Sequence, residues 1–160
     1  MKKIEISTSL TIYDSVEELP VDVQQLVKIA IESRKTAYAP YSNFNVGAAL
    51  MLENGKIISG NNQENAAYPS GICAERVAIW KAASDYPDIK VNKLVITANS
   101  NLKMVDSPVS PCGACRQTLF EYESKQEQSI EVYFMGETGK IFKTDSLKDL
   151  LPVAFSKLLL

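Results

Sequence analysis

Three cysteines in two short clusters are the residues of this chain best suited to bind a metal. Cys73 lies in GICAERVAIW (71–80), and Cys112 and Cys115 lie in SPCGACRQ (110–117). Cysteines three positions apart on the first turn of a helix face the same side, and tetrahedral zinc with Zn–S bonds of about 2.3 Å places its sulfurs about 3.8 Å apart. The chain has no histidine. The pattern therefore fits a zinc site made of thiolates, although C-x-x-C alone equally fits a redox pair or half of a structural zinc site.

The third cysteine favours one shared site. Each cluster precedes an apolar helical pattern, so the thiols are expected at helix N-termini, where free N–H groups and the helix dipole favour thiolate over thiol. Three thiolates exceed the charge of a divalent cation, and Arg76 and Arg116 are expected to donate hydrogen bonds to sulfur and offset that excess. Three protein ligands leave the fourth position of zinc to water, which is typical of a catalytic zinc.

Glu75 is the expected proton carrier. It lies two residues after a cysteine, where it can reach over the metal without binding it, and apolar neighbours would raise its pKa into a range useful for acid–base catalysis. Alone, an acidic residue at a helix start needs no catalytic explanation, because the dipole favours it. Zinc deaminases, however, combine three His or Cys ligands, a non-ligand glutamate and a P-C-x-x-C motif. C-A-E at 73–75 with P-C-G-A-C at 111–115 matches an all-cysteine version of that combination.

These motifs resemble the small homotetrameric cytidine deaminases that act on free nucleosides. The resemblance runs from about Tyr38 to Phe155, through APYSNFNVGAAL, GNNQENAAYPSGICAERVAIWKA, SPCGACRQ and LLPVAF. It implies one zinc ion per subunit, held by the three cysteines. It also implies hydrolysis of cytidine and 2′-deoxycytidine to uridine and 2′-deoxyuridine with release of ammonia, in pyrimidine salvage. In that reaction zinc-bound hydroxide attacks C4 of the base and Glu75 shuttles the protons.

The resemblance further implies a set of substrate-binding residues, which are Phe44, Asn62, Glu64, Tyr68, Ala74 and Phe155. Asn62 and Glu64 match an N-x-E pair that holds the 3′-hydroxyl region of the ribose, and residues two apart on an extended loop point the same way. Phe44 matches an aromatic residue near the pyrimidine. Phe155 matches a C-terminal phenylalanine that reaches the substrate of a neighbouring subunit, which implies sites at the interfaces of a homotetramer. Tyr41 is expected near the same pocket.

Other interpretations stay open at this point. A related enzyme acting on another aminopyrimidine nucleoside would use the same metal site, although the N-x-E pair favours an unsubstituted ribose. A non-catalytic protein with a structural zinc would need a fourth protein ligand. A redox protein built on Cys112 and Cys115 would form a reversible disulfide.

Composition and charge limit the classes of partner. With 160 residues, 46 % hydrophobic and 22 % charged, the chain fits one globular domain spanning 1–160, in which 1–20 extends beyond the family resemblance. A net charge of −2 with scattered basic residues argues against a nucleic-acid partner. No stretch approaches the ~20 apolar residues of a membrane span, and the N-terminus lacks the apolar core of a signal peptide. We therefore expect no membrane partner and a cytoplasmic location.

The elements that must position the site follow from hydrophobic periodicity and turn residues. SVEE at 15–18 resembles a capping box, and 1–13 forms either an edge strand or an arm. The predicted helices are 21–37, 73–84, 112–124 and a last one capped by Ser146. The predicted strands are 45–52, 56–60, 91–99, 130–135 and 140–144, with a turn at Asn54–Gly55. This order favours an α/β fold with three α/β/α layers around a mixed sheet of about five strands, as in cytidine deaminases.

Overall fold

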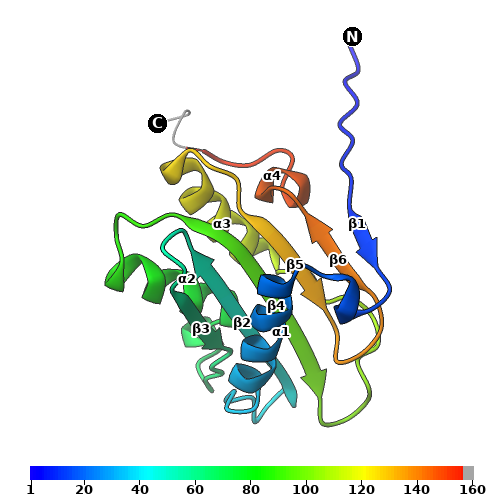
Figure 1. The fold of residues 1–160 in the computed structure, drawn as a ribbon, viewed down its shortest axis with the longest axis vertical. Helices are drawn as coiled ribbons and strands as arrows, with labels where there is room; N and C mark the ends of the chain where they lie inside the picture. The colour runs from blue at the N-terminus through cyan, green and yellow to red at the C-terminus, as the bar shows by residue number, and fades with distance from the viewer. Residues whose placement is uncertain (157–160) are drawn as a thin grey trace.

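The computed structural model describes residues 1–156, which build one mixed sheet (Figure 1). Its strands are β1 (Thr11–Tyr13), β2 (Phe44–Leu52), β3 (Ile57–Asn61), β4 (Val91–Ser100), β5 (Glu131–Met135) and β6 (Ile141–Thr144). They lie in the order β1-β6-β5-β4-β2-β3; β4 and β5 are parallel, and the other neighbours are antiparallel. The sheet has six strands rather than about five, because the short β1 pairs with β6 as an edge strand.

Helices cover both faces of this sheet, so the predicted three-layer arrangement is confirmed (Figure 1). One face packs against α1 (Val21–Arg34), and the other packs against α2 (Ala74–Asp85), α3 (Gly113–Gln126) and the short α4 (Leu147–Leu150). Strand β4 is apolar along most of its length because both of its faces are buried. Leu94 and Ile96 belong to the core under α2 and α3, whereas Val95 belongs to the core under α1.

Two glycines set how closely the helices approach the sheet. A Cβ at Gly47 in β2 would lie 2.0 Å from the carbonyl oxygen of Ala30 in α1. A Cβ at Gly60 in β3 would lie 2.7 Å from the carbonyl oxygen of Ala74 and from the backbone nitrogen of Ala78. Gly60 therefore lets the N-terminal end of α2, where Cys73 is located, rest directly on the sheet.

Most predicted boundaries agree with the structure, and two details were wrong. The first helix ends at Arg34 instead of 37, because the N–H groups of residues 35–37 bond to carbonyls three positions back and form turns. The buried Arg34 guanidinium donates to Thr97 Oγ1 (2.5 Å) and to the Ala98 carbonyl (3.3 Å). Ser15 makes no capping hydrogen bond. Ser146 caps α4 as predicted, since its hydroxyl accepts from the backbone N–H of Lys148.

Candidate active site

The three cysteines converge where α2 and α3 begin. Cys73 and Cys112 are the N-cap residues of the two helices, and Cys115 lies on the first turn of α3. The Sγ atoms of Cys73 and Cys112 are 3.8 Å apart, those of Cys112 and Cys115 are 3.4 Å apart, and all three lie within 4.8 Å of one another. These separations match the sulfur spacing around tetrahedral zinc, about 3.8 Å. The thiol set therefore fits a zinc ion, and within residues 1–156 no histidine, further cysteine or carboxylate completes the group as a fourth ligand.

The electrostatics of the cluster favour negative sulfur. The hydrogen bond with Cys115 is the largest influence lowering the pKa of Cys73, to about 5, and the guanidinium of Arg76 acts in the same direction. The same bond, together with burial, raises the pKa of Cys115. Before metal binds, the negative charge is thus favoured on Cys73, and a metal must displace the proton of Cys115.

Glu75 lies on the first turn of α2 and is almost completely buried, with 4 % of its surface exposed. Burial, together with the negative charge of Cys73, raises the pKa of Glu75 from 4.5 to about 7. Glu75 is not part of the metal-ligand group. A carboxyl group with a near-neutral pKa beside a metal site suits general acid–base chemistry at neutral pH.

The two arginines have different partners. Arg76 Nη2 donates to the sulfur of Cys73 over 3.6 Å, and the guanidinium lies 5.9 Å from the centre of the Trp80 ring. Arg116 contacts no sulfur. It donates to Pro111 O, Ser110 Oγ and Leu150 O, and so ties the loop before α3 to α4. The expectation for Arg116 was wrong because nearer carbonyl and hydroxyl oxygens take up its donors.

A cavity of about 770 Å³ opens in front of the cluster. Its volume lies in the usual range of small-molecule sites. The predicted residues that line it are Tyr41, Phe44, Asn62, Glu64, Tyr68, Cys73, Glu75, Arg76 and Cys112. The structure thus brings together segments that are up to 71 positions apart in the sequence, from Tyr41 to Cys112.

The N-x-E pair reaches this cavity from the loop after β3. The carboxylate of Glu64 accepts hydrogen bonds from the backbone N–H of Tyr41 (2.9 Å) and of Ser42 (3.3 Å) and from the hydroxyl of Ser42. These bonds lower the pKa of Glu64, the Ser42 hydroxyl most of all. Asn62 accepts from the Val46 N–H and donates to the Phe44 carbonyl, both 2.9 Å or shorter. Both side chains are therefore fixed in place before any ligand arrives.

Three predicted residues do not line the cavity. Ala74 is fully buried, and so is Cys115, which nevertheless belongs to the group of three sulfurs. Phe155 is 59 % exposed, and its carbonyl accepts from Gln117 Nε2 over 2.9 Å. Phe155 therefore does not line the pocket of its own chain, and its expected contact with the substrate of a neighbouring subunit stays a prediction.

Sequence reasoning missed several lining residues, which are Ser42, Val46, Asn65, Gly71, Ile72, Ile96, Val109 and Ser110. Ser42 and Val46 stand inside the APYSNFNVGAAL segment, and Ser110 directly precedes the second cysteine motif. Their position next to recognised motifs was the available signal. Ile96 carried no such signal, because in the sequence it is simply an apolar residue of a buried strand.

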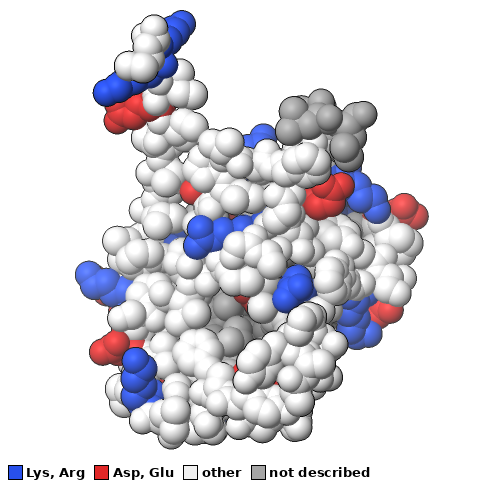
Figure 2. Space-filling view, turned by 180° about the vertical axis from the view of Figure 1, so that it is seen from behind, with Lys and Arg blue, Asp and Glu red and all other residues white. Residues whose placement is uncertain are grey.

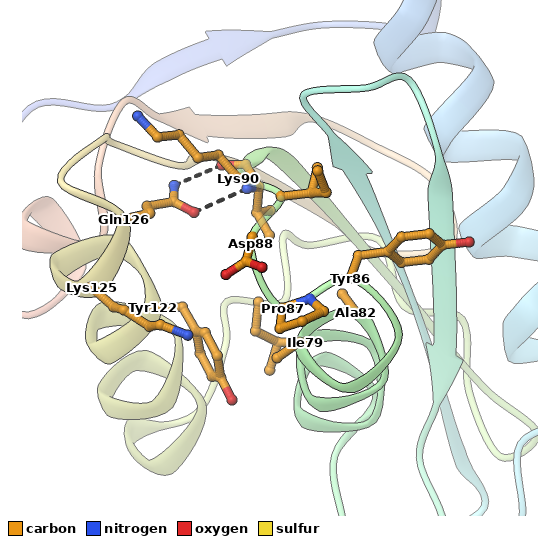
Figure 3. Close-up of a pocket in the computed structure, with 12 residues that line it drawn as sticks. Ile79, Ala82, Tyr86, Pro87, Asp88, Lys90, Tyr122, Lys125 and Gln126 are labelled. Atoms are coloured by element: carbon orange, nitrogen blue, oxygen red, sulfur yellow. Dashed lines mark hydrogen bonds between the residues drawn. The ribbon is translucent and has the colours of Figure 1, made fainter.

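A second cavity, of about 270 Å³, lies at the opposite ends of α2 and α3 (Figure 3). Its walls include Ile79, Pro87 and Tyr122, and Gln126 closes one side through hydrogen bonds to the backbone of Val91. This cavity contains no cysteine and no group of metal ligands. The chemistry of the molecule is thus located at the other end of the helix pair.

The outer surface carries charges of both signs. On the face shown in Figure 2, basic and acidic side chains are interspersed and do not gather into a patch of one sign. Among the described residues, no helix combines the length and apolar character that crossing a membrane requires.

Comparisons with known proteins agree with this site. A family model described as the zinc-binding region of cytidine and deoxycytidylate deaminases matches residues 20–129. The cytidine deaminase of Sporosarcina psychrophila is 44 % identical over 138 residues, which cover 86 % of this chain and 93 % of that protein. The cytidine deaminase of Halalkalibacterium halodurans is 40 % identical over 136 residues, 85 % of this chain and 96 % of the other. The crystal structure of cytidine deaminase from Burkholderia pseudomallei has a TM-score of 0.71 and 37 % identity, covering 82 % and 97 % of the two chains.

Proposed function

Because this chain belongs to the family of zinc-dependent cytidine and deoxycytidylate deaminases, we propose that it hydrolyses cytidine and 2′-deoxycytidine to the corresponding uracil nucleosides and ammonia. The chain is a zinc-dependent deaminase that acts on cytidine. The observation that carries the proposal is one juxtaposition: three thiols spaced for zinc adjoin a buried glutamate whose pKa is about 7, at one wall of a nucleoside-sized cavity.

The residues of the chain divide the chemistry between them. When bound, zinc supplies a Lewis acid that lowers the pKa of a coordinated water towards 7. Glu75 takes a proton from the attacking water and delivers it to N3 of the pyrimidine ring as the oxygen adds to C4. The same carboxylate then takes the proton of the new hydroxyl group at C4 and transfers it to the amine at C4, so that ammonia leaves as the C4 carbonyl forms. One water enters and one ammonia departs, so Glu75 ends the cycle as it began.

The other residues of the cavity position the substrate. Glu64 and Asn62 hold the ribose hydroxyl groups, and Glu64 can do so without moving because the backbone of Tyr41 and Ser42 already orients it. Phe44 and Tyr68 line the cavity beside them and contact the base and the sugar. Arg76 offsets the negative charge of the thiolates through its contact with Cys73.

The assembly that we propose is a homotetramer with sites at its subunit interfaces. The exposed ring of Phe155, held outside its own pocket by the bond between Gln117 and the Phe155 carbonyl, supports a contact with the substrate of a neighbouring subunit. The chain acts as one domain over residues 1–160, with 1–20 as an extension. Three unpaired cysteines support a reducing, cytoplasmic location.

A substrate panel tests the function directly. The zinc-loaded protein is incubated with cytidine, 2′-deoxycytidine, cytosine, cytidine monophosphate and a different aminopyrimidine nucleoside, and ammonia is measured for each. We expect release from the first two at comparable rates and little from cytosine, which lacks the ribose. Protein treated with a chelator is the control and should regain activity when zinc is restored. Activity on the monophosphate alone would contradict the substrate assignment, and no ammonia from any compound would favour a structural zinc.

A further inference from the structure

The first ten residues form an extended arm that leaves the body of the molecule. Figure 1 shows the chain running away from β1 at the edge of the sheet, and Figure 2 shows the arm projecting from the opposite view. Residues 1–10 belong to no helix or strand, and they have no hydrogen-bond partner among the described residues. The arm also precedes residues 20–129, the region that matches the deaminase family. The family's reaction therefore leaves it unexplained.

The arm has the sequence of an amphipathic strand. Its even positions carry Ile4, Ile6, Leu10 and Ile12, whereas the odd positions between them carry Glu5, Ser7, Ser9 and Thr11. Side chains two apart lie on the same face of a strand. All four apolar side chains are exposed, Ile4 at 81 % and Ile6 at 53 %. A strand with one apolar face and unpaired backbone groups is built to pair with another strand.

We propose that the arm pairs antiparallel with the same arm of a second copy of the chain, around a two-fold axis at Thr8. In this register residue i lies opposite residue 16 − i of the partner. Ile4 then faces Ile12, and Ile6 faces Leu10, so each of these four apolar residues has an apolar partner. Neighbouring registers lose this match: a shift to 14 − i places Ile6 opposite Thr8.

Charge favours the same register. Lys2 comes to lie opposite Asp14 of the second copy, and no like charges face each other. Opposite-charge and apolar cross-strand pairs stabilise a sheet, whereas like charges directly opposite destabilise it. A two-fold contact between identical chains uses the same segment of both copies. In an antiparallel pair the segment must therefore be complementary to its own sequence read in the opposite direction. An unrelated partner would not require this symmetry.

The neighbouring structure supplies a surface for the apolar face of the arm. Tyr13 packs near Tyr133 on the α1 side of the sheet, with ring centres 6.5 Å apart. Ile12 must therefore point to the opposite side, where its cross-strand neighbour Phe142 packs against the core under α3 and α4. Ile4 of the second copy, placed beside Ile12, would extend this apolar surface. The two sheets would join through their β1 edges, and each free edge would be covered.

A disulfide scan tests the register. The axis at Thr8 puts the two Cα atoms of this position about 4.5–5.5 Å apart, within the range that a disulfide can bridge. Thr8→Cys in the zinc-loaded full-length protein should form a covalent dimer when oxidised glutathione is added, read on a non-reducing gel. Ile4→Cys is the matched control, because its own copy lies eight positions away, about 26 Å. We expect at least tenfold faster cross-linking of Thr8→Cys, with wild-type protein giving the background of the three native cysteines.

Deletion of residues 1–10 provides the second measurement. The truncated protein should keep its deaminase activity when it is assayed at a concentration at which it is still assembled, which shows that it folds. Its association on dilution should weaken about 100-fold or more, since several large apolar side chains per copy lose their burial. Analytical ultracentrifugation over a dilution series measures the change. The proposal is overturned if Thr8→Cys cross-links no faster than Ile4→Cys, if the cross-link forms to the body of the partner, or if the deletion leaves association unchanged.

Discussion

The two ends of the α2–α3 helix pair are built for different purposes. At the N-terminal ends, Cys73 and Cys112 cap the helices, Glu75 is buried beside them, and a wide cavity opens. At the C-terminal ends, a smaller cavity is walled by apolar side chains, and Gln126 makes three hydrogen bonds to backbone groups of Val91 and Gln128 (Figure 3). The same two helices thus carry reactive groups at one end and satisfied polar groups at the other.

Helix polarity accounts for this difference. The N-terminal turn presents free N–H groups and positive potential, which stabilise the thiolates that a metal needs. The C-terminal turn presents free carbonyl groups, which would repel thiolates and must be paired or solvated. Substitutions at the N-terminal ends should therefore change activity, whereas substitutions at the C-terminal ends should change stability alone.

The largest effect is expected from Cys115→Ser. Serine is a poor zinc ligand, so the variant should lose zinc, and activity should fall at least ~10⁴-fold because water is no longer activated from its pKa of 15.7 towards 7. Zinc content by mass spectrometry and ammonia release measure both quantities. A variant that kept its activity while free of zinc would refute the metal site.

Glu75→Gln should be next in size. Loss of the proton carrier is expected to lower kcat by about 10²–10⁴ while zinc stays bound, because the three thiols are untouched. Asp85→Asn, at the other end of α2 where Asp85 pairs with exposed Lys81, is the matched control and should be indistinguishable from wild type. Equal losses in the two variants would mean that carboxylates on α2 act through stability and not through chemistry.

The sequence predicted the fold well because its local signals and its long-range packing agree. The Asn54–Gly55 turn is present, with Gly55 at φ 78°, and Ser146 caps α4. Residues 1–13 were predicted as an edge strand or an arm, and the structure contains both, because only Thr11–Tyr13 pair with β6. The end of α1 was missed because the apolar spacing continues to Ala37, whereas the backbone N–H groups of residues 35–37 already bond three positions back as turns.

Site residues that belong to a recognised motif could be predicted from the sequence. Site residues that reach the cavity only through the three-dimensional fold could not. The convergence of Cys73 with Cys112 and Cys115 followed from residue types and helix starts. The role of Arg116 did not, because oxygens of Pro111, Ser110 and Leu150 take up its donors, and Leu150 is 34 positions away in the sequence. Ile96 enters the cavity only because β4 runs beneath it.

In the metal-free protein, the cost of burying the charged Glu75 carboxylate should appear as a pH dependence of the free energy of unfolding. Since burial raises the pKa of Glu75 from 4.5 to about 7, its neutral form stabilises the fold at pH 4.5 and below, and that contribution is lost as the pH rises through 7. Between pH 4.5 and 8, wild type should therefore lose about 3 kcal/mol relative to Glu75→Gln. The lowered pKa of Cys73 acts in the opposite sense, but it is present in both proteins. Urea unfolding of chelator-treated protein measures the difference, and parallel pH profiles would contradict the assignment.

The smallest effect is expected at the C-terminal end, from Gln126→Ala. The variant loses three hydrogen bonds and leaves the backbone groups of Val91 without these partners, so the free energy of unfolding should fall by about 1–2 kcal/mol. Glu121→Ala, an exposed change on the same helix, is the control and should alter stability by less than about 0.5 kcal/mol. In both variants kcat should stay within twofold of wild type, since neither residue lines the larger cavity. If Gln126→Ala lowered kcat tenfold with zinc still bound, α3 would transmit strain along its length to Cys115, and the two ends could no longer be treated as independent.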